Sequence, residues 1–273
     1  MALLSRKMEY ALRDGNPVHI SEVERGLACG CVCPACGEPL IAKKGTKMMH
    51  HFSHVSGSEC EHGYETSLHI AAKTILSKAQ RIVLPTVYAE FETPTSYCTR
   101  HITDGPVELH IDRVELEKRV DSIVPDIIVY SKNRPLLVEI FVTHKADDVK
   151  ISKIKKLGLS AIEIDLHRIN SSSKCLEDIL VGNVQNKRWL NNEYANRYVL
   201  RLLAIVEKKP IIRRRLDDGS VLHVENCPKR VRVWNGKPYA NYINDCRDCE
   251  YNIGQDGERI LCAGKVRLKN DDT

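Results

Sequence analysis

Residues 125–142, PDIIVYSKNRPLLVEIFV, decide the fold of this chain. Two apolar runs flank a polar segment made of turn-forming residues, so the stretch predicts a β-hairpin. The second run is apolar except at Glu139, as expected of a central strand that is covered on both faces. A carboxylate there is costly unless it is hydrogen-bonded, paired or bound to a cation. Asp126 leads the first run, so the hairpin would bring together two hard oxygen ligands that can share a Mg²⁺ ion.

The hairpin belongs to a longer segment, residues 63–168, whose hydrophobic pattern predicts a mixed α/β core. An order of helix, strands, helix and strand favours a mixed sheet flanked by helices. The expected helices are residues 65–80 and 146–157, and the strand-like runs beside the hairpin are residues 82–84, 107–116 and 161–166.

Changes in composition divide the chain into three expected parts. Residues 1–62 are rich in Cys, His and Gly, residues 63–168 form the predicted core, and residues 169–273 hold a second group of cysteines. Within the last part, residues 186–209 have the pattern of an amphipathic helix. Its apolar surface is sufficient to pack internally or against a second copy of the chain, so a homo-oligomer is one of the alternatives.

Composition limits the class of protein. The 273 residues can form one sizeable core with appendages, and a net charge of +5 suits a nucleic-acid partner without requiring one. No long apolar run predicts a membrane span, and residues 1–7 lack the apolar stretch of a secretory signal, so we expect a cytoplasmic protein. There, 11 cysteines with CxxC pairs and neighbouring histidines indicate zinc rather than disulfides.

The N-terminal part carries a zinc-type pattern. Cys33 and Cys36 are followed by His51 and His54, after a predicted hairpin around residues 43–45. Two thiolates and two imidazoles match a tetrahedral structural zinc site. A loop of reduced cysteines is the alternative, and other residues compete as ligands. These competitors are Cys29, Cys31, His50, Cys60 and His62.

A second group of thiols lies near the C-terminus and predicts a second structural zinc site. It has one CxxC pair, Cys246 and Cys249, and two outlying cysteines, Cys227 and Cys262. Four thiolates around zinc would fold a segment that has too few apolar residues to fold unaided.

The first predicted helix offers further polar groups to the carboxylate pair. Glu65, His69 and Lys73 are spaced four apart and share one helix face. Glu65 is the natural third metal ligand, and His69 can contact phosphate or carry a proton for the attacking water. The alternative is a solvated helix face. Three acidic residues on the strand before the hairpin, and on the connection that follows that strand, compete for the same site. They are Glu115, Glu117 and Asp121.

Metal-assisted phosphodiester cleavage needs a cation that lowers the pKa of a bound water, and a nearby lysine usually orients that water. Two residues after Glu139, where a PD-(D/E)xK nuclease carries this lysine, the chain has Phe141. Lys145 would lie on the same strand face as Glu139 if the strand continues, so it can reach back. The alternative is a charge that flanks the next helix.

These segments together resemble the competence protein CoiA-like family, over roughly residues 27–168. The resemblance implies a cytoplasmic DNA-processing protein with an N-terminal zinc-binding segment and a PD-(D/E)xK-type nuclease core. It implies Glu65, Asp126 and Glu139 as site carboxylates, with His69 beside them, and nothing for residues 171–273. The segments that carry it are residues 31–37 (CVCPACG), 51–54 (HFSH), 65–69 (ETSLH), 125–126 (PD), 138–145 (VEIFVTHK) and 162–166 (IEIDL).

Three functions follow from these patterns. The first is a Mg²⁺- or Mn²⁺-dependent deoxyribonuclease in DNA processing or defence, with zinc as a structural ion and other proteins of those processes as partners. The second is a non-catalytic DNA-binding or recombination-accessory protein that keeps a nuclease-like fold. The third is a zinc-dependent hydrolase, disfavoured because four protein ligands leave no position for water. The basic residues that can contact phosphates in either DNA-binding reading are Lys43, Lys44, Arg213, Arg214 and Arg215.

Overall fold

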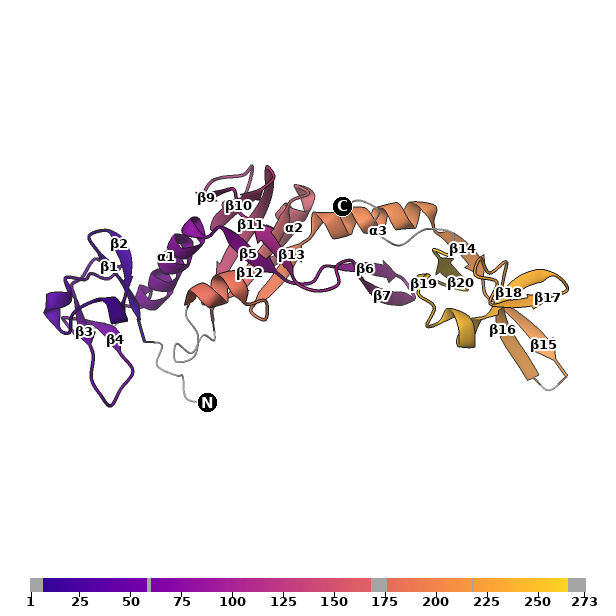
Figure 1. Cartoon of the computed structure of the whole chain (residues 1–273), viewed down its shortest axis with the longest axis horizontal. Coiled ribbons are helices and arrows are strands. Elements are labelled where there is room, and N and C mark those ends of the chain that lie inside the picture. Colours follow the sequence, from indigo (N-terminus) through magenta and orange to yellow (C-terminus); the bar gives the residue numbers. More distant parts are fainter. Residues whose placement is uncertain (1–6, 58–59, 168–175, 218, 265–273) are drawn as a thin grey trace. The chain divides into compact units, whose positions relative to one another are not determined.

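The computed structural model describes residues 7–57, 60–167, 176–217 and 219–264 of the 273-residue chain. By its contacts the chain forms two compact units (Figure 1). The first unit is Met1–Pro85 with Pro106–Asn192, and the second is Thr86–Gly105 with Glu193–Thr273. This division differs from the three parts expected from composition, because the Cys/His-rich segment and the α/β core share one unit.

A five-stranded mixed sheet is the centre of the first unit. The pair β11–β12 is parallel and the other pairs are antiparallel. The predicted hairpin is β10–β11, and its two loop residues, Lys132 and Asn133, have φ values of 48° and 61°. Positive φ at both positions is the type I′ geometry that matches the twist of the flanking strands. In sheet order the strands are β13 Lys187–Asn191, β12 Ser160–Asp165, β11 Arg134–Phe141, β10 Ile127–Ser131 and β9 Arg113–Leu116.

Helices cover both faces of this sheet. Helix α1, Gly63–Lys78, buries Ala72 and Leu76 in one core cluster with Val138 of β11. Helix α2, Asp148–Lys156, buries Ile154 in a second cluster with Leu137, the preceding residue of β11. Adjacent strand residues point to opposite faces, so a nearly all-apolar β11 is what a sheet covered on both sides requires. The mixed α/β fold expected for the core is thus present.

One expected helix is shorter than the sequence pattern predicts. Residues 187–191 form β13 and pair antiparallel with β12, and helix α3 begins only at Glu193 and ends at Ile205. The reason is tertiary: Leu190 is buried in the cluster beneath α2, and the indole Nε1 of Trp189 donates to the carbonyl of Pro85 at 3.2 Å. Sheet pairing and burial override local helical propensity.

The Cys/His-rich segment consists of two hairpins on a small core. Met8, Ile20, Leu40 and Phe52 are buried there together with Cys29, Cys31 and Cys33. The predicted hairpin around residues 43–45 is β3–β4. The strands are β1 Tyr10–Arg13, β2 Asn16–His19, β3 Leu40–Lys43 and β4 His51–His54, with 3₁₀ turns at Ile20–Glu22 and Leu27–Cys29; elsewhere in the first unit β5 Arg81–Leu84 pairs with β8 Val107–His110, and a π-helical turn spans Asp178–Gly182.

The second unit contains a hairpin, a three-stranded sheet, a four-stranded sheet and α3. The hairpin β6–β7 packs on α3 around Phe91 and Leu202. Its strands are β6 Tyr88–Thr93 and β7 Ser96–His101. The three-stranded sheet has the order β14 Glu207–Pro210, β20 Arg259–Cys262 and β19 Asn252–Asp256. The other sheet has the order β15 Ile212–Leu216, β16 Gly219–Glu225, β18 Lys237–Asn241 and β17 Arg232–Trp234, and a π-helical turn spans Tyr242–Cys246.

Membrane-spanning helices were sought over the part of the chain that the structure describes. None of the helices there combines the length and the apolar character needed to cross a bilayer.

Candidate metal centre and active site

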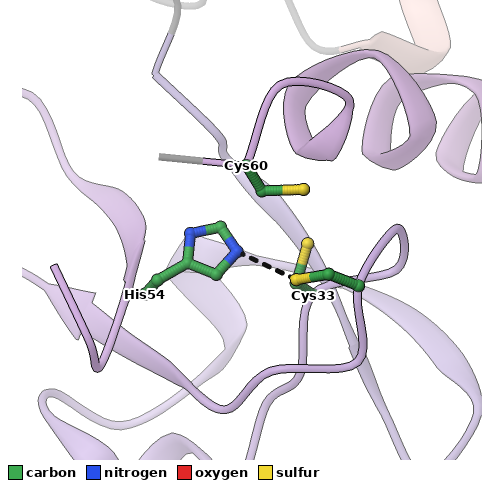
Figure 2. A group of neighbouring side chains, drawn as sticks. Cys33, His54 and Cys60 are labelled. Atoms are coloured by element: carbon green, nitrogen blue, oxygen red, sulfur yellow. Dashed lines mark hydrogen bonds between the residues drawn. The ribbon is translucent and has the colours of Figure 1, made fainter. Parts of the chain in front are cut away.

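Four potential metal ligands converge in the N-terminal segment of the first unit. Ligand atoms of Cys33, Cys36, His54 and Cys60 all lie within 4.8 Å of one another. Cys33 and Cys36 lie on a tight turn in which Gly37 N donates to the Cys33 carbonyl at 2.9 Å, and His54 ends β4. Figure 2 shows Cys33, His54 and Cys60 turned toward one shared space. Three thiols and one imidazole are a donor set for tetrahedral zinc.

The cluster contains Cys60 where the sequence pattern pointed to His51. His51 and His54 are three residues apart on β4, so their side chains leave opposite faces of the strand. His54 faces the buried side with Phe52, whereas the imidazole Nδ1 of His51 lies 2.9 Å from the Met49 carbonyl. The HxxH spacing would place both rings together on a helix or in a loop, but not on a strand.

The chemistry of the cluster fits a structural zinc ion. Burial raises the pKa of the Cys33 thiol to about 11, and a bound cation would offset that cost by stabilising the thiolate. Four protein ligands fill a tetrahedral shell, which leaves no position for a reactive water. The zinc-hydrolase alternative has no support from this arrangement.

The cluster also contacts the start of α1. Gly63 N, at the first residue of the helix, donates to the Cys60 carbonyl at 3.1 Å. A Cβ at Gly63 would lie 3.3 Å from the Cys33 sulfur. An ion held by Cys33 and Cys60 would therefore fix the N-terminus of α1, the helix that carries Glu65, His69 and Lys73.

We expect His51→Ala to leave the zinc content of the purified protein unchanged, and Cys60→Ser to lower it by about one ion per chain, because a tetrahedral site needs its fourth ligand. Metal analysis of both variants beside the parent protein checks this. Zinc loss in His51→Ala, with zinc retained in Cys60→Ser, would show that His51 is the fourth ligand, as the sequence pattern predicts.

The predicted carboxylate pair meets in the first unit. Asp126 directly precedes β10, and the pairing of Ile127 with Val138 places it across from Glu139 on β11. The carboxylate Oδ2 of Asp126 accepts from Ile140 N at 2.8 Å. Residues that face each other on an antiparallel pair have Cβ atoms about 5 Å apart, which is a spacing that one cation can bridge.

Asp126 is held in its charged form by α1. The Nζ of Lys73 lies 3.0 Å from Asp126 Oδ1, and the Nδ1 of His69 lies 3.7 Å from the same oxygen. Burial by itself would raise the pKa of Asp126. The nearby His69 ring, the hydrogen bond from Ile140 N and the charge of Lys73 outweigh burial and hold this pKa well below its usual range. Lys73 also binds Glu117, one of the competing acidic residues, at 2.8 Å.

The pKa of Glu139 is shifted in the opposite direction to that of Asp126. Its side chain is buried, and burial, with a further contribution from the Asp126 charge, raises its pKa to about 7 even though Lys150 opposes the shift. The Nζ of Lys150 donates to Glu139 Oε2 at 2.7 Å. The other oxygen, Oε1, is buried without a hydrogen-bond partner among the described residues. A buried polar atom of this kind is costly, so the geometry fits a ligand for a cation.

Glu65, the expected third ligand, contacts a different part of the chain from the two other residues of its helix face. Its Oε1 lies 3.8 Å from the Nδ1 of His144, which follows β11. Of the three residues on the polar stripe of α1, His69 and Lys73 contact Asp126, whereas Glu65 contacts the chain beyond the sheet. The helix therefore presents His69 and Lys73 to Asp126, while Glu65 reaches the segment that follows β11.

The lysine beside Glu139 is Lys150 rather than the expected Lys145. The Nζ of Lys145 lies 5.4 Å from the centre of the Phe141 ring. Lys150 comes from the first turn of α2, whose N-cap Asp147 accepts from Lys150 N at 2.6 Å. The Asp147 cap was a readable signal for where α2 starts. That α2 lies over Glu139 depends on tertiary packing, which spacing along the strand does not reveal.

The basic residues expected to contact phosphates differ in how far their side chains are already bound within the protein. Lys44 is tied down, because its Nζ donates to the carbonyls of Ser21, at 3.3 Å, and of Val23. Lys43 lines an open hollow together with Arg25 and Lys47.

The triplet Arg213–Arg215 lies on β15, so Arg214 points to the opposite face from its two neighbours. The guanidinium of Arg214 lies 5.1 Å from the centre of the exposed Trp234 ring and 3.6 Å from Glu225. Arg213 and Arg215 are exposed on the other face.

The four C-terminal cysteines line one cavity in the second unit. They come from three separate stretches of chain, which the fold brings together. Their ligand atoms are farther apart than those of the N-terminal group. Among the described residues, that group alone brings three or more His, Cys, Asp or Glu ligand atoms within 4.8 Å of one another.

Comparison with known proteins supports the N-terminal part of the resemblance. Residues 21–63 match the family model described as competence protein CoiA, N-terminal domain. All four members of the N-terminal cluster, Cys60 included, fall within the matched residues. No curated protein and no solved structure was found to match the chain.

Proposed function

We propose that the chain is a Mg²⁺- or Mn²⁺-dependent nuclease that hydrolyses phosphodiester bonds of DNA at the Asp126–Glu139 pair. The observation that carries the proposal is the buried Glu139 Oε1 without a hydrogen-bond partner among the described residues, on the strand directly across from Asp126. The match of residues 21–63 to a competence-protein domain supports a role in handling DNA.

Asp126 and Glu139 would hold the divalent cation. When bound, such an ion lowers the pKa of a water and offsets the charge that develops on the leaving oxygen. Lys150 orients the Glu139 carboxylate through its bond to Oε2, which leaves Oε1 for the cation. Lys73 and His69 lie at Asp126 Oδ1, where they can bind a phosphate oxygen brought in by the substrate. Arg188, which neutralises the neighbouring Glu163 at 2.7 Å, keeps a third carboxylate from competing.

One observation favours the second candidate, a non-catalytic DNA-binding or recombination-accessory protein. Each carboxylate already has a lysine, Lys73 at Asp126 and Lys150 at Glu139. Two partly buried ion pairs of this kind can keep a nuclease-like fold together without a metal. The lysines would then act as structural partners.

A cleavage assay separates the two candidates. The purified chain is incubated with supercoiled, linear double-stranded and single-stranded DNA, and with RNA, in Mg²⁺ or Mn²⁺, and a mobility-shift assay is run in parallel. Cleavage that needs the divalent ion and disappears in Glu139→Gln supports the nuclease. Retention of DNA without cleavage of any substrate supports the accessory protein.

We expect Lys150→Met to reduce the cleavage rate by about 10²-fold or more, and Lys145→Met to change it by less than about 3-fold. The reason is that Lys150 contacts Glu139 at 2.7 Å, whereas Lys145 lies against Phe141. Single-turnover rates of both variants at saturating Mg²⁺ check this. A larger loss of cleavage in Lys145→Met than in Lys150→Met would indicate that Lys145 is the lysine that orients the water.

A further inference from the structure

We propose that Cys227, Cys246, Cys249 and Cys262 bind a second zinc ion, as four thiolates, in the second unit. The proposal stands apart from the nuclease assignment, because the first unit contributes no residue to this site. It gives the second unit a metal core of its own.

The fold delivers the four thiols to one place from three segments. Cys227 follows β16, Cys246 and Cys249 flank a tight turn after β18, and Cys262 ends β20. All four line the same cavity, next to Val224 and Ile260. The four cysteines are up to 35 positions apart in the sequence, so their meeting in one cavity is not a result of being neighbours along the chain.

The backbone around the cysteines has the tight turns that present thiolates to a metal. Arg230 N donates to the Cys227 carbonyl at 3.0 Å, and Cys249 N donates to the Cys246 carbonyl at 3.1 Å. The segments after Cys227 and Cys262 are pressed together, since a Cβ at Gly264 would lie 2.5 Å from the Pro228 ring. The segments that follow the two outlying cysteines therefore lie against each other, although one comes after β16 and the other after β20.

The four thiols are open to a cation in this cavity. The Cys246 side chain is buried there, and the three other cysteines line the same cavity. All ten cysteines in the described residues are free, so these four are available as ligands. In a tetrahedral zinc–thiolate site the sulfur atoms are about 3.8 Å apart, as follows from Zn–S bonds of about 2.3 Å. Rotation of the thiols into the shared cavity would close the wider spacing.

The surrounding core is too small to explain how this region folds. The cluster that joins the two sheets buries Val224, Ala240, Cys246 and Ile260. Segments with so little apolar surface usually need a metal or disulfides to fold. All-thiolate tetrahedral sites select zinc or iron, and four protein ligands leave no open position, so the role is structural.

Metal analysis of the full-length purified chain tests the proposal. We expect about two zinc ions per chain in the parent protein and about one in Cys249→Ser. Cys98→Ser is the matched control, because Cys98 lies in the same unit outside this cavity, and it should retain both ions. Cys36→Ser, in the N-terminal cluster, should also retain one, and the double variant Cys36→Ser with Cys249→Ser should retain none.

Two measurements on the parent protein keep the proposal testable if Cys249→Ser does not fold. Stepwise blocking of thiols with a mercurial should release zinc in two stages, and replacement by Co²⁺ should give thiolate absorption from two ions per chain. One zinc ion per chain, disulfides among these four cysteines, or iron in place of zinc would overturn the proposal.

Discussion

Glu139→Gln is expected to reduce DNA cleavage by at least about 10³-fold while the fold and DNA binding are retained. The amide has nearly the shape of the carboxylate but lacks its charge, so it remains a poor ligand for Mg²⁺ or Mn²⁺. The effect should be large because Oε1 has no hydrogen-bond partner in the described part of the chain that could substitute for a cation. Single-turnover cleavage with a mobility-shift control measures both properties.

Glu163→Gln is the matched control for this substitution. Glu163 is paired with Glu139 in the parallel β11–β12 register and is also buried. Its two oxygens are already used, by Arg188 Nε at 2.7 Å and by Ala146 N at 2.8 Å. We therefore expect Glu163→Gln to lower thermal stability but to keep the response to Mg²⁺. Equal cleavage by Glu139→Gln and the parent protein would remove Glu139 from the active site.

The same residue gives a prediction for stability without any substrate. The pKa of Glu139 is raised from 4.5 to about 7 in the folded chain, so between these pH values the folded state binds more protons than the unfolded state. Stability of metal-free protein should therefore fall as pH rises from about 4.5 to about 7, and it should fall less in Glu139→Gln. Added Mg²⁺ should recover the loss at pH 7.5 in the parent protein alone. Thermal unfolding across this pH range, with and without Mg²⁺, measures it.

The central hairpin was predictable because its signals are local. Two apolar runs and a turn of Ser, Lys and Asn fix the strands, and the position of each carboxylate in its run then fixes which residues face each other. The hairpin β6–β7 was equally readable, since Ala89 and Phe91 are buried and alternate with the exposed Tyr88, Glu90 and Glu92. No hairpin was predicted there, since the run is short and rich in polar residues.

The lysine at Glu139 and the fourth zinc-type ligand were not predictable from spacing. Lys150 reaches Glu139 because α2 packs on the sheet face to which Glu139 points, and this is a property of the assembled core. Choosing Cys60 over His51 required knowing that residues 51–54 form a strand, which puts His51 and His54 on opposite faces. In the first case the fold places another lysine, Lys150, at Glu139, and in the second it places a cysteine, Cys60, where a histidine was expected.

Loss of the N-terminal metal is expected to unfold the Cys/His-rich segment and to slow cleavage, even though the cluster lies outside the carboxylate pair. Structural zinc supplies about 10–16 kcal/mol of apparent binding free energy in small zinc modules. The core here, with Phe52, Leu40, Ile20 and Met8 as its largest members, is too small to replace that contribution.

The loss would reach the active site through α1. Cys60 accepts from the first residue of the helix, and Lys73 and His69 of the same helix contact Asp126. We expect Cys33→Ser to raise hydrogen exchange in the first turns of α1 and to lower the cleavage rate by about 10²-fold, with Mg²⁺ in excess. Cys98 lies in the second unit, so Cys98→Ser should change neither the hydrogen exchange of α1 nor the cleavage rate. If Cys33→Ser lost zinc but kept normal cleavage and exchange in α1, the cluster would stabilise its own segment and would not position the helix.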